Sequence, residues 1–198
     1  MKFSITNKLI TKGQIVILVV LVVALGAALL VQNKFLRIYD PEFVLLDLDV
    51  DQFRLNLPLS QHKQGAMVQV LSPGCPCNGF SRDHIGLLTK KSQKYVDHFV
   101  WLVGAGEDSV LQRYAESLGI PIQNVQWRTQ QELSWLPATP AALIVNRDQR
   151  LAYVGPFSDG VRCTSENSFV DRILGNVATG LTVFTQLNSQ VHGCFCQL

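Results

Sequence analysis

Two cysteines separated by one residue, Cys75 and Cys77, are the residues of this chain best suited to chemistry. They follow a short apolar run at residues 66–71, which predicts a buried strand, and they precede a pattern that predicts a helix. The first turn of a helix offers unpaired backbone N–H groups and the positive end of the helix dipole, and both favour a thiolate over a thiol. A thiol pair at this place therefore indicates thiol–disulfide chemistry.

Three further cysteines, Cys163, Cys194 and Cys196, bring the total to five. Cys194 and Cys196 repeat the one-residue spacing, and His192 lies beside them. In an oxidising compartment an odd number leaves at least one cysteine unpaired within the monomer, which suits an exchange system. A structural interpretation is the alternative: Cys194 or Cys196 pairs with Cys163 or with the first cysteine pair and simply pins the C-terminal residues.

The hydrophobic pattern predicts the elements that position these cysteines. Their order, β-α-β-α-β-β-α, joins a right-handed parallel unit to an antiparallel hairpin, so we expect an α/β fold with a central mixed sheet flanked by helices. The last strand of this topology runs parallel to the first, which would let Cys163 approach Cys75 or Cys77. The expected strands cover residues 66–71, 98–103, 141–145 and 150–154, and the expected helices cover about 78–91, 108–118 and 168–177.

An apolar stretch near the N-terminus predicts a membrane anchor. Residues 15–31 are an unbroken run of apolar or small residues, close to the length that spans a hydrocarbon core. A cleaved signal peptide is the alternative. Three lysines precede the run, so the positive-inside rule predicts a cytoplasmic N-terminus. We therefore expect a single-pass protein of a bacterial inner membrane whose C-terminal domain faces the periplasm, where disulfides are permitted.

The expected organisation has five parts. The connector alternates at residues 46–51 and 53–57, the period of a half-buried strand, so it is expected to add an extra strand. Five of the 17 Lys and Arg residues lie in residues 1–37, which contain no Asp or Glu, so the rest of the chain is mildly acidic. It therefore lacks the excess of positive charge that binding to nucleic acid requires. The parts are a cytoplasmic N-terminus (1–14), a transmembrane anchor (15–33), the connector (34–65), a folded domain (66–178) and a cysteine-containing tail (179–198).

The order of elements, with cysteines after the first strand, resembles the thioredoxin-like superfamily. In that family a cis-proline facing the dithiol precedes the strand that opens the second half of the fold. Pro140, which follows Thr139 directly before the third expected strand, holds the matching position. The resemblance covers about residues 66–178 and extends to little-characterised bacterial proteins with one membrane span and a Cys-Pro-Cys motif. It implies that Cys75 attacks, that Cys77 resolves, and that Thr139 and Pro140 line the groove for a partner.

The motif departs from the Trp-Cys-x-x-Cys sequence usual in this family, because it is one residue shorter and lacks the tryptophan. A disulfide between Cys75 and Cys77 would close a small, strained ring, and strain makes a disulfide easier to reduce. The spacing thus favours oxidase or isomerase behaviour over strong reductase behaviour. Pro76 removes a backbone donor and restricts the preceding residues to extended geometry, which limits formation of that ring.

Three functions are consistent with these residues. The first is thiol–disulfide exchange by a membrane-anchored periplasmic oxidoreductase that needs no cofactor and acts on protein thiols or disulfides, with a membrane redox partner. The second is binding or delivery of copper(I) or zinc, for which thiolates and imidazole are suitable ligands. The third is a non-catalytic adaptor held together by structural disulfides. The metal ligands in the second interpretation are Cys75, Cys77, Cys194, Cys196 and His192.

Overall fold

The computed structural model describes residues 12–39, 53–181, 186–187 and 191–198. The chain divides into two compact units, Met1–Lys34 and Phe35–Leu198. Most of α1 (Lys12–Phe35) belongs to the first unit. Its segment Gly13–Gln32 is long and apolar enough to cross a membrane, and a signal sequence near the N-terminus has the same character. The predicted apolar N-terminal helix is therefore confirmed.

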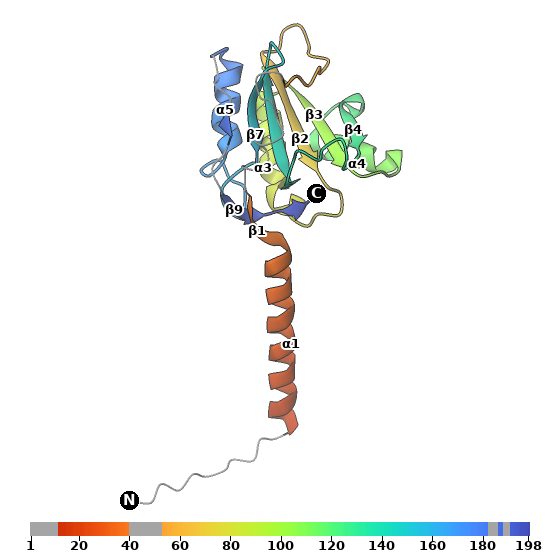
Figure 1. The fold of residues 1–198 in the computed structure, drawn as a ribbon, viewed down its shortest axis with the longest axis vertical. Coiled ribbons are helices and arrows are strands. Elements are labelled where there is room, and N and C mark those ends of the chain that lie inside the picture. The colour runs from red at the N-terminus through yellow and green to blue at the C-terminus, as the bar shows by residue number, and fades with distance from the viewer. Residues whose placement is uncertain (1–11, 40–52, 182–185, 188–190) are drawn as a thin grey trace, which may run out of the picture. The chain divides into compact units, whose positions relative to one another are not determined.

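The second unit is built on a six-stranded mixed sheet with the order β4-β3-β2-β6-β7-β8. Figure 1 labels β2, β3, β4 and β7 of this sheet. β2 runs parallel to β3, and β3 runs parallel to β4. β6 is antiparallel to both β2 and β7, so β7 is parallel to β2, as the sequence predicted. The strands are β2 (Gly65–Leu71), β3 (Val96–Val103), β4 (Val125–Arg128), β6 (Ala141–Asn146), β7 (Leu151–Gly155) and β8 (Gln186–Leu187).

Helices cover one face of this sheet. The main helices are α3 (Asn78–Ser92), α4 (Asp108–Leu118) and α5 (Phe169–Ala178), and a short 3₁₀ helix, η1 (Ile122–Asn124), precedes β4. Because successive side chains of a strand point to opposite faces, Met67 of β2 joins the core beneath these helices. Its neighbours Ala66 and Val68 join a second core on the other face. The predicted mixed sheet flanked by helices is confirmed.

The second face is covered largely by irregular chain. Residues 53–57 do not form the expected strand: within the described residues they contribute one antiparallel bridge, between Arg54 and Arg150. The apolar side chains of this stretch, including Leu55 and Leu57, instead pack on the second core. The alternation of apolar and polar residues in this stretch thus reflects a half-buried surface and not hydrogen-bonded pairing in a β-sheet. The other part of the expected extra strand, residues 46–51, lies outside the described residues.

Four short strands lie outside the main sheet and form two small two-stranded sheets. β1 (Leu36–Tyr39) pairs antiparallel with β9 (Val191–Cys194). β5 (Ala138–Thr139) pairs antiparallel with β10 (Cys196–Gln197). These pairings bring the last residues of the chain beside the start of β6, an arrangement that the hydrophobic pattern did not predict.

Candidate functional site

Cys75 and Cys77 lie between the end of β2 and the start of α3, as expected. β2 ends at Leu71, and a turn follows in which the Cys75 N–H donates to the carbonyl of Ser72 at 2.8 Å. Cys77 is the N-cap residue of α3. Both cysteines are buried, with 6% of Cys75 and none of Cys77 exposed. The pair is thus part of a packed junction and not an open surface motif.

The first turn of α3 differs from the expected anion-stabilising geometry. Its N–H groups are already occupied, because Asn78 donates to Cys75 O at 3.2 Å, Gly79 to Pro76 O at 3.1 Å and Phe80 to Cys77 O at 3.1 Å. These donors are directed at the carbonyls of the cysteine motif itself. The helix dipole therefore remains as the feature of this turn that favours a thiolate.

The two cysteines of the motif are not bonded to each other. Cys75 forms a disulfide with Cys196, with Cα atoms 6.0 Å apart. Cys77 forms a disulfide with Cys194, with Cα atoms 5.3 Å apart. The small ring considered from the sequence is therefore not formed in this state, and each member of the first pair is joined to the second pair. We call these four residues the sulfur cluster.

Strand pairing explains why the second cysteine pair reaches the first. Cys196 of β10 lies opposite Thr139 of β5, and Thr139 directly precedes Pro140. The Thr139–Pro140 peptide bond is cis, in the position that the family resemblance implied. The Sγ atom of Cys75 lies 3.9 Å from the carbonyl oxygen of Thr139. The sulfur cluster and the proline therefore share one end of the fold.

The polar groups around Cys75 act in opposite directions on a free thiol. The dipole of α3 favours the thiolate, whereas the Thr139 carbonyl can accept a hydrogen bond only from the neutral thiol. Thr139 is fully buried, and its Oγ1 atom has no hydrogen-bond partner among the described residues. This hydroxyl is a buried donor that no acceptor among the described residues satisfies. The neighbourhood thus suits a sulfur that changes its bonding.

Three of the four sulfurs are close enough to be exchanged or to share a metal. The Sγ atoms of Cys75, Cys77 and Cys196 all lie within 4.8 Å of one another. Cys194 belongs to the same packed group through its bond to Cys77. His192 is exposed and is not part of this group of described ligand atoms. The structure therefore brings together three of the five ligands considered for a metal, and the fourth, Cys194, is bonded to one of them.

Cys163 does not join the sulfur cluster. Among the described residues it is the cysteine without a disulfide, and it packs in the core beneath the helices. Burial raises the pKa of the Cys163 thiol to about 11; a hydrogen bond with Ser158 opposes this shift, and the charge of Asp171 adds to it. A thiol of this kind stays protonated at neutral pH and is a poor nucleophile. The expected approach of Cys163 to Cys75 or Cys77 does not produce a bond.

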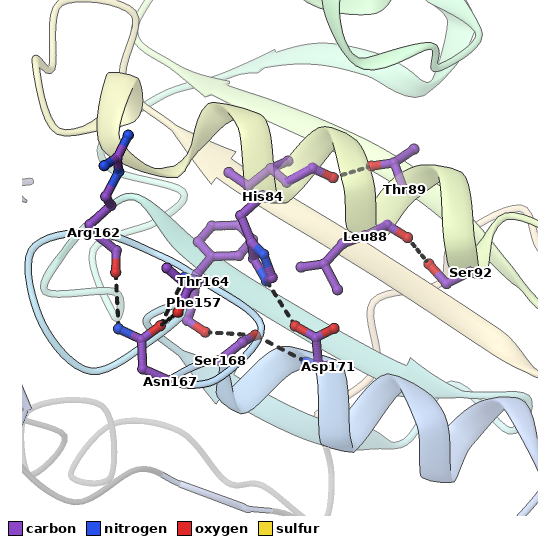
Figure 2. A network of polar contacts seen from close by, with 11 residues as sticks. His84, Leu88, Thr89, Ser92, Phe157, Arg162, Thr164, Asn167, Ser168 and Asp171 are labelled. Carbon is purple, nitrogen blue, oxygen red and sulfur yellow. Dashed lines mark hydrogen bonds and ion pairs between the residues drawn. The ribbon is translucent and has the colours of Figure 1, made fainter.

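His84 also has a structural partner. It lies on α3, and its Nε2 atom is 2.8 Å from Oδ2 of Asp171 on α5 (Figure 2). Ser168 caps α5 by accepting a hydrogen bond from the Asp171 N–H at 3.2 Å. The pair links the two helices. His84 thus holds α3 against α5.

Comparison with known sequences identifies the family. Residues 47–198 match the family described as "Domain of unknown function (DUF6436)". The chain belongs to this family. No curated protein sequence matches it. The DUF6436 match includes all of the sulfur cluster, Thr139 and Pro140.

Comparison with solved structures finds chains of similar fold at low sequence identity. An uncharacterized conserved protein from Geobacillus kaustophilus matches with a TM-score of 0.54 and 19% identity, over 68% of this chain and 76% of that one. A hypothetical protein from Sinorhizobium meliloti 1021 gives a TM-score of 0.48 and 16% identity, over 69% and 79%. A thiol:disulfide interchange protein of the thioredoxin family from Chlorobium tepidum TLS gives 0.44 and 14%, over 58% and 80%. The strand order of the main sheet and the cis Thr139–Pro140 bond agree with the thioredoxin-like fold that the sequence resemblance implied.

The structure brings together most of the residues that the sequence predicted for the site, by connections that the sequence left open. Cys75, Cys77, Thr139 and Pro140 were expected together and lie together. The pairing of Cys194 and Cys196 with the first two cysteines was one of the alternatives left open. The two-residue strands that enforce this pairing were missed, because two residues carry no detectable period. The Cys-Phe-Cys spacing at the end of the chain was the available signal, since it matches the spacing of the first pair.

Proposed function

We propose that this DUF6436 protein exchanges disulfides with protein thiols or disulfides, as a membrane-anchored thiol–disulfide oxidoreductase. The observation that carries the proposal is the sulfur cluster itself: two adjacent disulfides beside the Thr139–Pro140 bond of a thioredoxin-like fold. Exchange proceeds when a thiolate attacks a disulfide sulfur, so it needs sulfurs in contact and one that a partner can reach. The cluster supplies both features.

The proposed location is the outer face of a bacterial inner membrane. The apolar segment Gly13–Gln32 provides the span, and the three lysines before it favour a cytoplasmic N-terminus. Disulfides persist in the periplasm but are reduced in the cytosol, so the two buried disulfides support a periplasmic domain. In this arrangement residues 66–178 form the exchange domain, and residues 179–198 carry the second cysteine pair.

The proposed roles follow the family resemblance and the contacts. Cys75 is the attacking thiol once it is reduced, and Cys77 resolves the mixed disulfide. Thr139 and Pro140 shape the groove in which an extended partner segment lies. The proposed reaction uses the sulfur atoms of the chain alone, so no cofactor is required.

The test compares Cys75→Ser with the full-length wild type in detergent micelles. Insulin reduction and refolding of a scrambled disulfide protein are measured with a thiol reductant as the electron source. Wild type should accelerate at least one of these reactions, and Cys75→Ser should return it to the uncatalysed rate. Cys163→Ser is the matched control, because Cys163 is a buried thiol outside the sulfur cluster. Equal rates for wild type and Cys75→Ser would contradict the proposal.

A non-catalytic role is supported by a specific observation. Both disulfides join the first cysteine pair to the last residues of the chain, which is the arrangement of a structural staple. A protein of this kind would show no turnover in either assay. It would also keep both disulfides in the presence of a modest excess of reduced glutathione.

A metal-binding role is supported by the spacing of the sulfurs. After reduction, Cys75, Cys77 and Cys196 would present three thiolates within 4.8 Å of one another, a distance compatible with one copper(I) or zinc ion. The oxidised form cannot bind in this way, because disulfide sulfurs are not thiolate ligands. Retention of one metal ion per reduced chain through gel filtration, lost in Cys75→Ser, would support this role.

A further inference from the structure

The last residues of the chain are seated by backbone pairing as well as by disulfides. We call residues 191–198 the tail segment. Its β9 part pairs with β1, and its β10 part pairs with β5. The N–H of Gly160 donates to the carbonyl of His192 at 2.8 Å, and the side chain of Phe195 is buried against Ala138. The tail segment therefore occupies the edge of β5 directly before Pro140, where the proposed function needs a partner.

Exposure is unequal among the four sulfur-bearing residues. Cys75, Cys77 and Cys194 are each at most 7% exposed, whereas Cys196 is intermediate. A disulfide is opened by a thiolate that must reach one of its sulfurs. Cys196 is consequently the residue at which an external thiol meets the cluster, and the bond that it opens is the one to Cys75.

The bond that opens first lies beside a second disulfide. The Sγ atoms of Cys75 and Cys77 belong to the group whose members lie within 4.8 Å of one another, and Cys77 is bonded to Cys194. A thiolate released on Cys75 therefore has a disulfide sulfur as its neighbour. This is the contact that exchange within the chain requires.

We propose that the tail segment is a redox partner built into the chain, with Cys194 and Cys196 exchanging disulfides with Cys75 and Cys77. The first step uses a partner dithiol. One partner thiolate attacks Cys196 Sγ, the Cys75–Cys196 bond breaks, and Cys75 leaves as a thiolate. The partner's second thiolate then resolves the mixed disulfide, so that the partner becomes a disulfide and Cys196 leaves as a thiolate that takes up a proton.

The second step occurs within the chain. The Cys75 thiolate attacks Cys77 Sγ, which forms a Cys75–Cys77 disulfide and releases Cys194 as a thiolate that also takes up a proton. Together the two steps transfer two electrons and two protons from the partner dithiol to Cys194 and Cys196. One disulfide is consumed, and the other moves into the first cysteine pair.

This sequence releases the tail segment after a single two-electron reduction. The oxidised form has two covalent links between the tail segment and the rest of the domain. After the two steps it has none, because the surviving disulfide joins Cys75 to Cys77. Non-covalent contacts alone then hold the tail segment on the edge of β5, and an extended partner segment can compete for that edge. The inference rests on the proposed function. It adds that the tail segment covers the partner-binding edge of β5 in the oxidised form and is released by reduction.

The experiment maps disulfides after limited reduction of the full-length wild type in detergent micelles. The oxidised protein receives one molar equivalent of dithiothreitol under anaerobic conditions and is then quenched with N-ethylmaleimide at acidic pH. Peptide mass spectrometry should find Cys75 bonded to Cys77, with Cys194 and Cys196 both alkylated. Hydrogen exchange on the same sample should show loss of protection in residues 191–198. Cys163→Ser should give the same map, since its thiol takes no part.

Two results would overturn the inference. One is a singly reduced species that keeps Cys77 bonded to Cys194, or Cys75 bonded to Cys196. The other is direct passage from two disulfides to none without a species in which Cys75 is bonded to Cys77. Neither result depends on turnover of a protein substrate. The proposed function fails separately, if Cys75→Ser and wild type have equal rates in the insulin and refolding assays.

Discussion

The contributions of the two disulfides to stability should not add: whichever bond is removed first should cost much less than the bond removed second. The Cys75–Cys196 bond closes a loop with a sequence separation of 121 residues. In the chain-entropy treatment, a loop of that length contributes about 5 kcal/mol at 25 °C. Once it is closed, the Cys77–Cys194 bond closes a ring through residues 75–77 and 194–196 alone. A ring of that size contributes only about 2 kcal/mol in the same treatment.

Pairwise alanine variants test this difference. Replacing Cys77 and Cys194 together should lower the free energy of unfolding by about 2 kcal/mol, because the long loop stays closed. Replacing Cys75 and Cys196 should cost about the same, since the other bond then closes a loop of similar length, with a separation of 117. Replacing all four should cost about 7 kcal/mol.

The assay is equilibrium unfolding in guanidinium chloride, followed by tryptophan fluorescence of the full-length protein in detergent micelles. The quadruple variant should match the wild type unfolded in the presence of a strong reductant, which controls for packing changes at alanine. A loss of about 5 kcal/mol for each pair alone, adding to about 10 for all four, would refute the reasoning. A loss under 2 kcal/mol for the quadruple variant would also refute it, because the tail segment would then not constrain the unfolded chain.

Three further predictions concern other parts of the fold. Burial lowers the pKa of His98 to about 4, so between pH 6.5 and 4 the unfolded protein binds a proton at this residue more readily than the folded protein. The free energy of unfolding should therefore fall by up to about 3 kcal/mol as the pH decreases through that window, and His98→Gln should flatten the change. Gly193→Ala should loosen the tail segment, because its new Cβ would lie 2.7 Å from the ring of Phe195; hydrogen exchange should report lost protection in residues 191–198, and Gly86→Ala, where nothing lies within 4 Å, is the control. The Cys163 thiol, with its pKa raised to about 11, should resist alkylation at pH 8 until the protein is unfolded.

Each of these has a contrary outcome. A pH profile of stability that is the same for wild type and His98→Gln would assign the acid sensitivity to other groups. Unchanged protection in Gly193→Ala would show that the tail segment shifts to accept a methyl group without loosening. Rapid alkylation of Cys163 in the folded protein would mean that this part of the core opens far more readily than its burial indicates.

The core of the fold was predictable because its elements carry a strong period. The expected helix at residues 108–118 coincides with α4, and Gly119 ends it with a positive φ of 65°. The expected strands each fall within two residues of β2, β3, β6 and β7. A long periodic pattern of apolar residues indicates directly which side chains are buried, and burial of those side chains determines where these helices and strands form. β4 was missed because its four residues follow a turn and are only partly buried.

The connections of the site were less predictable, because they depend on contacts between distant segments. β5 and β10 have two residues each, and nothing local in Ala138 or Gln197 indicates that they pair. That pairing nevertheless selects Cys196 as the partner of Cys75. The expected unpaired donors at α3 failed for a local reason. A turn at Cys75 to Cys77 supplies carbonyls to Asn78 and the two residues after it.

The small stability gained from a second disulfide also bears on the role of the sulfur cluster. A staple needs one bond, because the first closure removes most of the chain entropy and the second adds only about 2 kcal/mol. In the sulfur cluster, the Sγ atoms of Cys75, Cys77 and Cys196 lie within 4.8 Å of one another, and Cys196 is partly exposed to solvent. These are features that a staple does not need. Exchange between the bonds needs little movement of the backbone at Cys75 and Cys77, because their Sγ atoms already lie within 4.8 Å of each other. This arrangement supports the proposed exchange function over a purely structural role.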